Sequence, residues 1–209
     1  MTRTRIPTRR GMTLIELMIA LAITAMVAAA IAAMLIAVTD GERSRRDNRG
    51  YIVRTHAAKA RLGAYIAPCL RVLEVDGSDT VVWLNDWRRS GTVHATELRW
   101  LIFDGPNDAI DVYYVDLPDA WTEFQRNLED VEYSFTQDWF AVLSSYLTKG
   151  YVSKMTLVDG VDQVTVTTDE PAAVDSTEIS FELRFPTARG EDVIETVMIK
   201  ILKYQPPAL

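Results

Sequence analysis

The chain has 209 residues, 48% of them apolar, and a formal net charge of −7. That length allows one membrane anchor and one globular domain of ordinary size. The acidic balance argues against a nucleic-acid-binding surface, which would be basic. Cys69 is the only cysteine, which excludes an internal disulfide, so a packed core must hold the fold together.

A basic leader over 1–11 ends in glycine and is followed by a long apolar segment. The 27 residues of 12–38 are interrupted only by Glu16 and two threonines. As a helix they would be roughly 40 Å long, against a hydrocarbon core of about 30 Å. The pattern predicts a transmembrane helix over 12–39. Glu16 requires a reason, because a carboxylate costs roughly 2.5–3.5 kcal/mol at the bilayer centre and somewhat less near its edge.

The stretch Arg9-Arg10-Gly11-Met12-Thr13-Leu14-Ile15-Glu16 resembles the class III signal of type IV pilins and type II secretion pseudopilins. This resemblance implies that a prepilin peptidase cuts between Gly11 and Met12 and methylates the new amino terminus, Met12. It also implies that Glu16 is retained for assembly. Family members usually have phenylalanine in place of Met12. The proline that kinks many major pilin helices is replaced here by Ala33, which favours the secretion branch.

Glu16 is expected to pair with the freed amine of Met12 in an adjacent subunit, since both groups would lie at the same membrane depth. Such a pair would neutralise both charges and fix the axial offset between subunits. The resemblance places the protein in the inner membrane, with one span and a periplasmic globular domain. The partners it implies are prepilin peptidase, other pilin or pseudopilin subunits, membrane lipid and an exported protein cargo, with no nucleic acid.

Other interpretations of the amino terminus stay open. A conventional secretory signal has a shorter apolar region of about 7–15 residues, although the alanines at 28–30 and 32–33 offer a cleavage site. A single-pass anchor with a binding domain that does not polymerise fits the length, but it leaves Gly11 and Glu16 unexplained. Within the pilin-like class, the alternative is a minor type IV pilin of a pilus or DNA-uptake machine.

Size favours one member of the secretion branch. A chain of about 200 residues that keeps the glutamate looks most like the J-type minor pseudopilin, since the other types are usually smaller or lack the glutamate. The end of the chain is also similar to J-type chains. Leu157-Val158-Asp159-Gly160-Val161-Asp162 precedes a strand, and an alternating strand over 179–185 and a terminal strand follow.

The helical pattern continues beyond the membrane segment, over 40–67. An apolar face at spacings of three and four is formed by Tyr51, Thr55, Ala58, Leu62 and Tyr65. Pro68 is expected to end this helix, and Asp40-Gly41 is the expected bend. The basic residues off this face are expected to be solvated: Arg54, Lys59, Arg61 and Arg71.

Strand patterns fill most of the globular domain expected over 68–209. We expect strands at 81–84, 97–103, 110–115, 152–157, 161–167, 179–185 and 193–204. Hairpin turns are predicted at 105–108, at Val158-Asp159-Gly160 and at 189–192. Short helices are expected at 120–128 and 139–147, the second ending near Lys149-Gly150. The fold class is therefore α+β, with the long helix packed on an antiparallel sheet.

No catalytic or cofactor-binding constellation is found in the sequence. His56 and His94 have no cysteine or histidine nearby at metal-ligand spacing. The acids Asp104, Asp108 and Asp111 lack the ligand spacing of a calcium hand, so turn and edge-strand solubility is the better interpretation. Core or subunit contacts, rather than a sugar-binding face, are expected for the tryptophans Trp83, Trp87, Trp100, Trp121 and Trp139. We predict a non-enzymatic assembly protein with no metal or cofactor.

Overall fold

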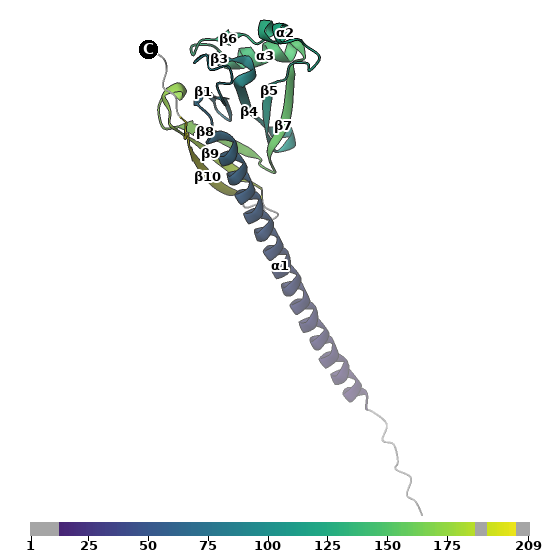
Figure 1. Cartoon of the computed structure of the whole chain (residues 1–209). Coiled ribbons are helices and arrows are strands. Elements are labelled where there is room, and N and C mark those ends of the chain that lie inside the picture. Colours follow the sequence, from purple (N-terminus) through teal and green to yellow (C-terminus); the bar gives the residue numbers. More distant parts are fainter. Residues whose placement is uncertain (1–12, 187–191, 204–209) are drawn as a thin grey trace, which may run out of the picture. The chain divides into compact units, whose positions relative to one another are not determined.

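A computed structural model describes residues 13–186 and 192–203 of the chain (Figure 1). Contacts divide the chain into two units, 1–48 and 49–209. Helix α1 (Leu14–Ile66) contributes to both units, and its ends agree with the predicted helix. The backbone stays helical through Asp40-Gly41, so the bend expected there does not interrupt the helix.

The unit 49–209 is built mainly from antiparallel strands. Five of them form one sheet in the order β1 (Arg71–Asp76), β2 (Asp79–Trp83), β4 (Leu98–Asp104), β5 (Ala109–Val115) and β7 (Val152–Asp159). A second sheet has the order β10 (Val193–Lys200), β9 (Glu178–Phe185) and β8 (Gln163–Thr168). A short pair is made by β3 (Val93–His94) and β6 (Glu132–Tyr133). Two further helices are α2 (Glu123–Glu129) and α3 (Trp139–Lys149).

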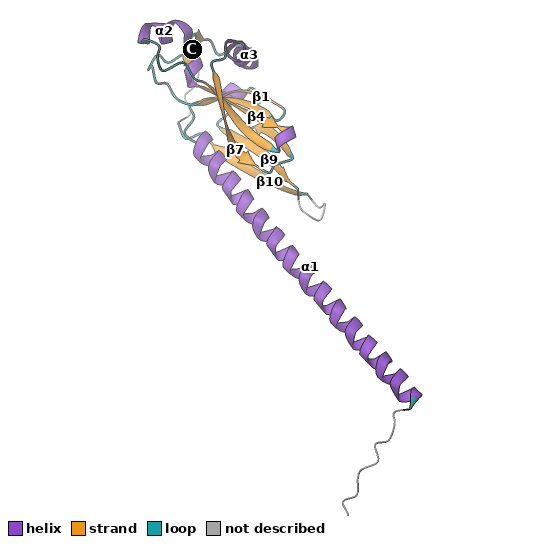
Figure 2. Cartoon of the chain, turned by 90° about the vertical axis from the view of Figure 1, so that its right-hand side faces the viewer, coloured by secondary structure: helices purple, strands orange, loops and turns teal. Residues whose placement is uncertain are grey.

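The last turns of α1 pack on the sheets of this unit. Figure 2 shows this end of the helix beside the strands. Ala58, Leu62 and Ile66 are almost fully buried in a core that both sheets line. The Tyr51 ring meets Phe185 of β9 edge to face, with 6.0 Å between the centroids. These contacts confirm the predicted α+β fold with a long helix against antiparallel strands.

A second core lies on the opposite face of the five-stranded sheet. Along β2, Val82 faces the first core, whereas Val81 and Trp83 face the second. Helix α3 covers the second core with a buried stripe at helical spacing: Trp139, Val142, Leu143 and Tyr146. The expected helix 139–147 is thus present, and Gly150 caps it with a φ of 74°. No pattern in the sequence predicted this second layer.

The hairpin predicted at Val158-Asp159-Gly160 is wrong. Strand β7 pairs with β5, and β8 pairs with β9, so the two strands belong to different sheets. The chain crosses over after Gly160 (φ 73°), where the amide of Val161 donates to the carbonyl of Asp108 at 2.9 Å. The buried residues before the turn belong to the five-stranded sheet, and those after it lead into the three-stranded sheet. Both sets pack into the first core, but as parts of different sheets they do not pair with each other.

The expectation that Arg71 is solvated is also wrong, because its side chain is fully buried. Arg71 lies in β1, beyond the end of the helix, so the helical pattern does not govern it. Its guanidinium lies over the ring of Phe135, 4.5 Å from the centroid, an arrangement that stabilises a desolvated cation. Strand β1 itself was not predicted.

The end of the chain differs slightly from expectation. β9 alternates buried and outward residues as predicted, and β10 pairs with it without a bulge. β10 ends at Lys200 rather than near Tyr204. The turn predicted at 189–192 lies mostly outside the described residues.

Candidate functional site: the amino-terminal helix

Thr13 and Glu16 form a reciprocal capping box at the start of α1. The Thr13 amide and hydroxyl donate to Oε2 of Glu16 at 2.9 and 3.1 Å. In return, the amide of Glu16 donates to the hydroxyl of Thr13 at 3.3 Å. This arrangement satisfies backbone donors that the first turn of a helix otherwise leaves without partners.

The charge of Glu16 also suits its position. A carboxylate in the first turn interacts favourably with the partial positive charge of the helix amino terminus. Glu16 is the only charged residue between Met12 and Thr39. Both bonds from Thr13 use Oε2, so the second oxygen, Oε1, keeps acceptor capacity for a further donor.

The segment Leu14–Thr39 is long and apolar enough to cross a membrane. At about 1.5 Å per residue its 26 residues extend about 39 Å. Its hydroxyl groups are satisfied inside the helix, as hydrocarbon requires. Thr24 donates to the carbonyl of Ala20 at 2.8 Å, and Thr39 donates to the carbonyl of Ile36 at 2.8 Å.

Of the predicted site residues, Glu16 lies among those described, whereas Gly11 and Met12 lie outside them. Thr13 was not among the predicted site residues, because it was counted only as one of two threonines that interrupt the apolar run. The sequence does contain a pattern that predicts this cap: Thr13-Leu14-Ile15-Glu16 is a Thr-x-x-Glu capping pattern immediately before an apolar stretch.

The acids considered for calcium have other partners. Asp111 is buried in β5, a central strand, so edge-strand solubility is the wrong interpretation for this residue. The Lys154 amine donates to its Oδ2 at 2.9 Å, and the Thr156 hydroxyl donates to Oδ1 at 2.7 Å. Burial raises the pKa of Asp111, but these hydrogen bonds and the charge of Lys154 outweigh it and lower the pKa overall. The same amine lies 3.7 Å from Asp104.

The histidines and the cysteine have structural surroundings. His56 is exposed on α1, whereas His94 is buried and its Nδ1 lies 3.3 Å from the carbonyl of Asp130. Cys69 is fully buried, and this burial raises the pKa of its thiol to about 12. Within the described ranges, no group of three or more His, Cys, Asp or Glu residues could hold a metal ion.

The tryptophans do not form one exposed face, because most of them lie in or against the second core. Trp83, Trp100 and Trp139 are buried in the second core. The indole of Trp83 donates to Glu97 at 3.1 Å, and that of Trp100 donates to the carbonyl of Trp139 at 2.9 Å. Trp121 is half-buried, and Trp87 is exposed.

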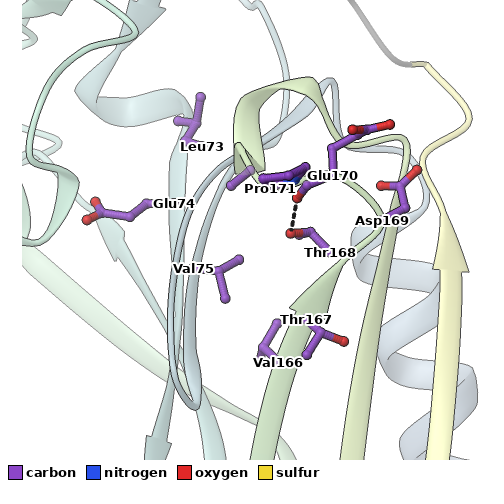
Figure 3. Close-up of a pocket in the computed structure, with 10 residues that line it drawn as sticks. Leu73, Glu74, Val75, Val166, Thr167, Thr168, Asp169, Glu170 and Pro171 are labelled. Atoms are coloured by element: carbon purple, nitrogen blue, oxygen red, sulfur yellow. Dashed lines mark hydrogen bonds between the residues drawn. The ribbon is translucent and has the colours of Figure 1, made fainter.

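A hollow of about 680 Å³ lies between β1 and the segment that follows β8 (Figure 3). Two of its carboxylates, those of Glu74 and Asp169, accept hydrogen bonds from backbone amides of the fold. Glu74 accepts the amide of Trp139 at 3.0 Å, and Asp169 accepts the amides of Thr177 and Glu178, both at 3.0 Å. The ten residues that line the hollow include no histidine, cysteine, lysine or arginine.

Comparison with known protein families gives a match for the amino-terminal segment. The family model described as the prokaryotic N-terminal methylation motif matches residues 6–32. No curated protein and no solved structure matches the chain. The motif supports a type IV pilin-like precursor, and it implies processing by prepilin peptidase and assembly with pilin-like subunits. The apolar helix Leu14–Thr39 agrees with membrane anchoring.

Proposed function

We propose that the chain is a minor pseudopilin of a type II protein secretion system, most like the J-type, and that it acts without catalysing a reaction. It is made with a leader over 1–11, cut between Gly11 and Met12, and methylated at Met12. Residues 12–39 anchor it in the inner membrane. Residues 40–67 continue the helix, and 68–209 form a periplasmic domain that meets other subunits and exported cargo.

The observation that carries this proposal is Glu16 in the capped first turn of a membrane-length helix. A carboxylate at such a position is unfavourable in hydrocarbon unless a partner compensates it. Thr13 supplies two hydrogen bonds, but it supplies no positive charge. The amine of a neighbouring Met12 would supply that charge, and Oε1 of Glu16 is the natural acceptor. Subunits would then assemble side by side with a fixed axial offset.

Intact mass of the mature protein tests the processing step. The membrane form should begin at an N-methylated Met12. In a Gly11→Phe variant the 11-residue leader should remain attached while membrane insertion persists, because the peptidase needs a small residue at the cut. Thr8→Phe adds the same bulk within the leader, away from the cut, and should be processed like the natural chain.

Two results would overturn the proposal. Normal trimming of the Gly11→Phe variant would show that the cut does not depend on Gly11. A natural chain that begins after one of the alanines at 28–33 would indicate a conventional secretory signal.

A further inference from the structure

Strand β10 forms one border of the three-stranded sheet. It has eight residues, and among the described strands it pairs with β9 alone. The register between the two strands is unbroken along the whole of β10. The other side of β10 therefore carries a row of backbone amides and carbonyls that no described strand uses.

The direction of these backbone groups follows from the two residues just beyond the strand. The amide of Ile201 donates to the carbonyl of Thr177 at 2.9 Å, in line with the pairing to β9. The next amide, that of Leu202, points the other way and donates to the carbonyl of Ala67 at 2.9 Å. Since this direction alternates along an antiparallel strand, the backbone groups that point away from β9 are those of residues 194, 196, 198 and 200.

The outer side of β10 suits the addition of another strand. The strand contains no proline and no bulge, two features that commonly block a free edge. On its solvent face, Ile194 and Met198 are 59% and 64% exposed, and Thr196 lies between them. A regular edge of this length with exposed apolar side chains is a template for an incoming extended segment.

Two charges on β10 indicate what the incoming strand must carry. Glu195 is half-buried on the side that faces the first core, opposite Leu183 of β9. Lys200 is exposed on the solvent face. Among the described residues, no ion pair includes either of them. A complementary strand would place a basic residue opposite Glu195 and an acidic residue opposite Lys200.

We propose that a different subunit of the same filament adds an extended strand to the outer edge of β10. The inference rests on the proposed function, which supplies neighbouring subunits. Main-chain hydrogen bonds to the outward groups hold the added strand, and the two charges fix its register. An apolar edge of this kind promotes aggregation unless it is covered, so a permanent subunit fits it better than transient cargo.

A second copy of the chain does not supply the complementary charges. Residues that oppose each other across two paired strands lie on the same face of the sheet. Glu195 and Lys200 lie on opposite faces of β10, and Lys200 is the only basic residue of the strand. In a two-fold antiparallel pair of two copies, Glu195 would therefore face an apolar residue or another acid instead of a base.

Site-specific photocrosslinking in the full-length chain tests this proposal in the cells that make it. A photoreactive phenylalanine analogue replaces Met198, beside the free edge. We expect one discrete adduct with a second protein whose own amino terminus is N-methylated, which distinguishes a subunit from cargo. Mass spectrometry should locate the contact in a segment with a basic and an acidic residue five positions apart, the spacing of Glu195 and Lys200.

Substitutions at the edge separate strand addition from a side-chain contact. Thr196→Pro removes an outward amide but no hydrogen bond to β9, so the sheet should persist. The adduct should fall roughly tenfold, because a carbonyl of the added strand loses its donor. Thr196→Val keeps the amide and should leave the adduct within about twofold of the natural level. Glu195→Lys should also lower the adduct roughly tenfold, since it opposes the incoming base with a like charge.

Thermal melting of the same variants shows whether each one folds. A normal adduct in a folded Thr196→Pro variant would overturn the proposal, and if that variant does not fold, a normal adduct in Glu195→Lys would do so. No adduct at 198, or an adduct with a second copy, lipid or an exported protein, would overturn it as well. If Met12 is the methylated terminus but no adduct forms, only the strand addition fails. A retained leader would instead count against the proposed function.

Discussion

The two halves of helix α1 have the same backbone and opposite environments. Between Leu14 and Thr39 the large apolar side chains lie on every side and are exposed. Between Tyr51 and Ile66 a stripe with Ala58, Leu62 and Ile66 is buried in the first core, whereas Ile52 and Val53, off that stripe, are exposed. Both halves are thus helical, but the distribution of their apolar residues differs. Apolar residues on every side suit lipid or other helices as surroundings, whereas a single apolar stripe suits packing on the sheets of the same chain.

The carboxylates of the first half of α1 and of the globular unit differ in the partners that they have. In the first half, Glu16 has a partner three residues away, Thr13, and no cation paired with it among the described residues. In the unit 49–209, buried carboxylates have partners far along the chain: Arg88 reaches Asp130, and Lys154 reaches Asp111. The globular unit therefore pairs these two buried carboxylates with cations of its own, whereas Glu16 has no ion pair among the described residues.

The largest effect should come from removing the second half of α1. A chain that starts near Asp40 should be a soluble, folded α+β domain. A chain that starts after Pro68 loses Ala58, Leu62 and Ile66 from the first core and exposes the sheet surface that they cover. We expect it to aggregate. Size-exclusion chromatography and thermal melting measure both. Equal solubility and equally cooperative melting would show that the helix is not part of the core.

A single substitution in the same stripe should have a smaller effect. Leu62 is fully buried, so Leu62→Ala should lower the free energy of unfolding by about 2–5 kcal/mol. Val53, on the exposed side of the same helix, is the matched control, and Val53→Ala should change it by less than about 0.5 kcal/mol. Urea unfolding of the domain that starts near Asp40 measures both. Similar losses for the two variants would contradict the buried stripe.

The pair of Asp111 and Lys154 should give a pH dependence. The folded pKa of Asp111 lies below its ordinary value of about 3.9, so its contribution is fully present above that pH and is lost as pH falls through the folded pKa. We expect part of the acid destabilisation below about pH 4 to disappear in Asp111→Asn. The variant should also be less stable at pH 7. An unchanged slope of stability against pH between about 2 and 4 would contradict the pairing.

The sequence predicted the helix, most strands and the class of fold because those elements follow local periodicity. It missed β1, the second core and the crossover after Gly160, since all three depend on which sheet a strand joins. A turn containing Asp159-Gly160 suits a hairpin and a crossover equally well; distant packing decides between them. At the candidate site, Glu16 was noticed as an acid in an apolar run. Its local partner Thr13 was missed, although the capping pattern was visible.

The smallest effect on the globular unit, and the largest on assembly, is expected for Glu16. Glu16→Ala should leave the melting temperature of the globular unit unchanged, because the side-chain hydrogen bonds of Glu16 are with Thr13 in its own first turn. The variant should be cleaved and inserted at least as well as the natural chain, since the helix becomes more apolar by up to about 3 kcal/mol. It should nevertheless fail to join its partner subunits.

Glu16→Gln separates the two roles of this side chain. Glutamine at the third position of a helix can complete a capping box with Thr13, but it cannot pair with an amine as a charge. If the cap alone matters, the glutamine variant should assemble normally and Thr13→Ala should fail. If charge pairing matters, Glu16→Gln should fail like Glu16→Ala. We expect the second outcome. Crosslinking between single cysteines placed in neighbouring membrane helices measures assembly. Cys69 can stay, because a buried thiol with a pKa of about 12 is unreactive at neutral pH. Wild-type crosslinking in both Glu16 variants would remove the main physical support for the filament and favour a plain membrane anchor.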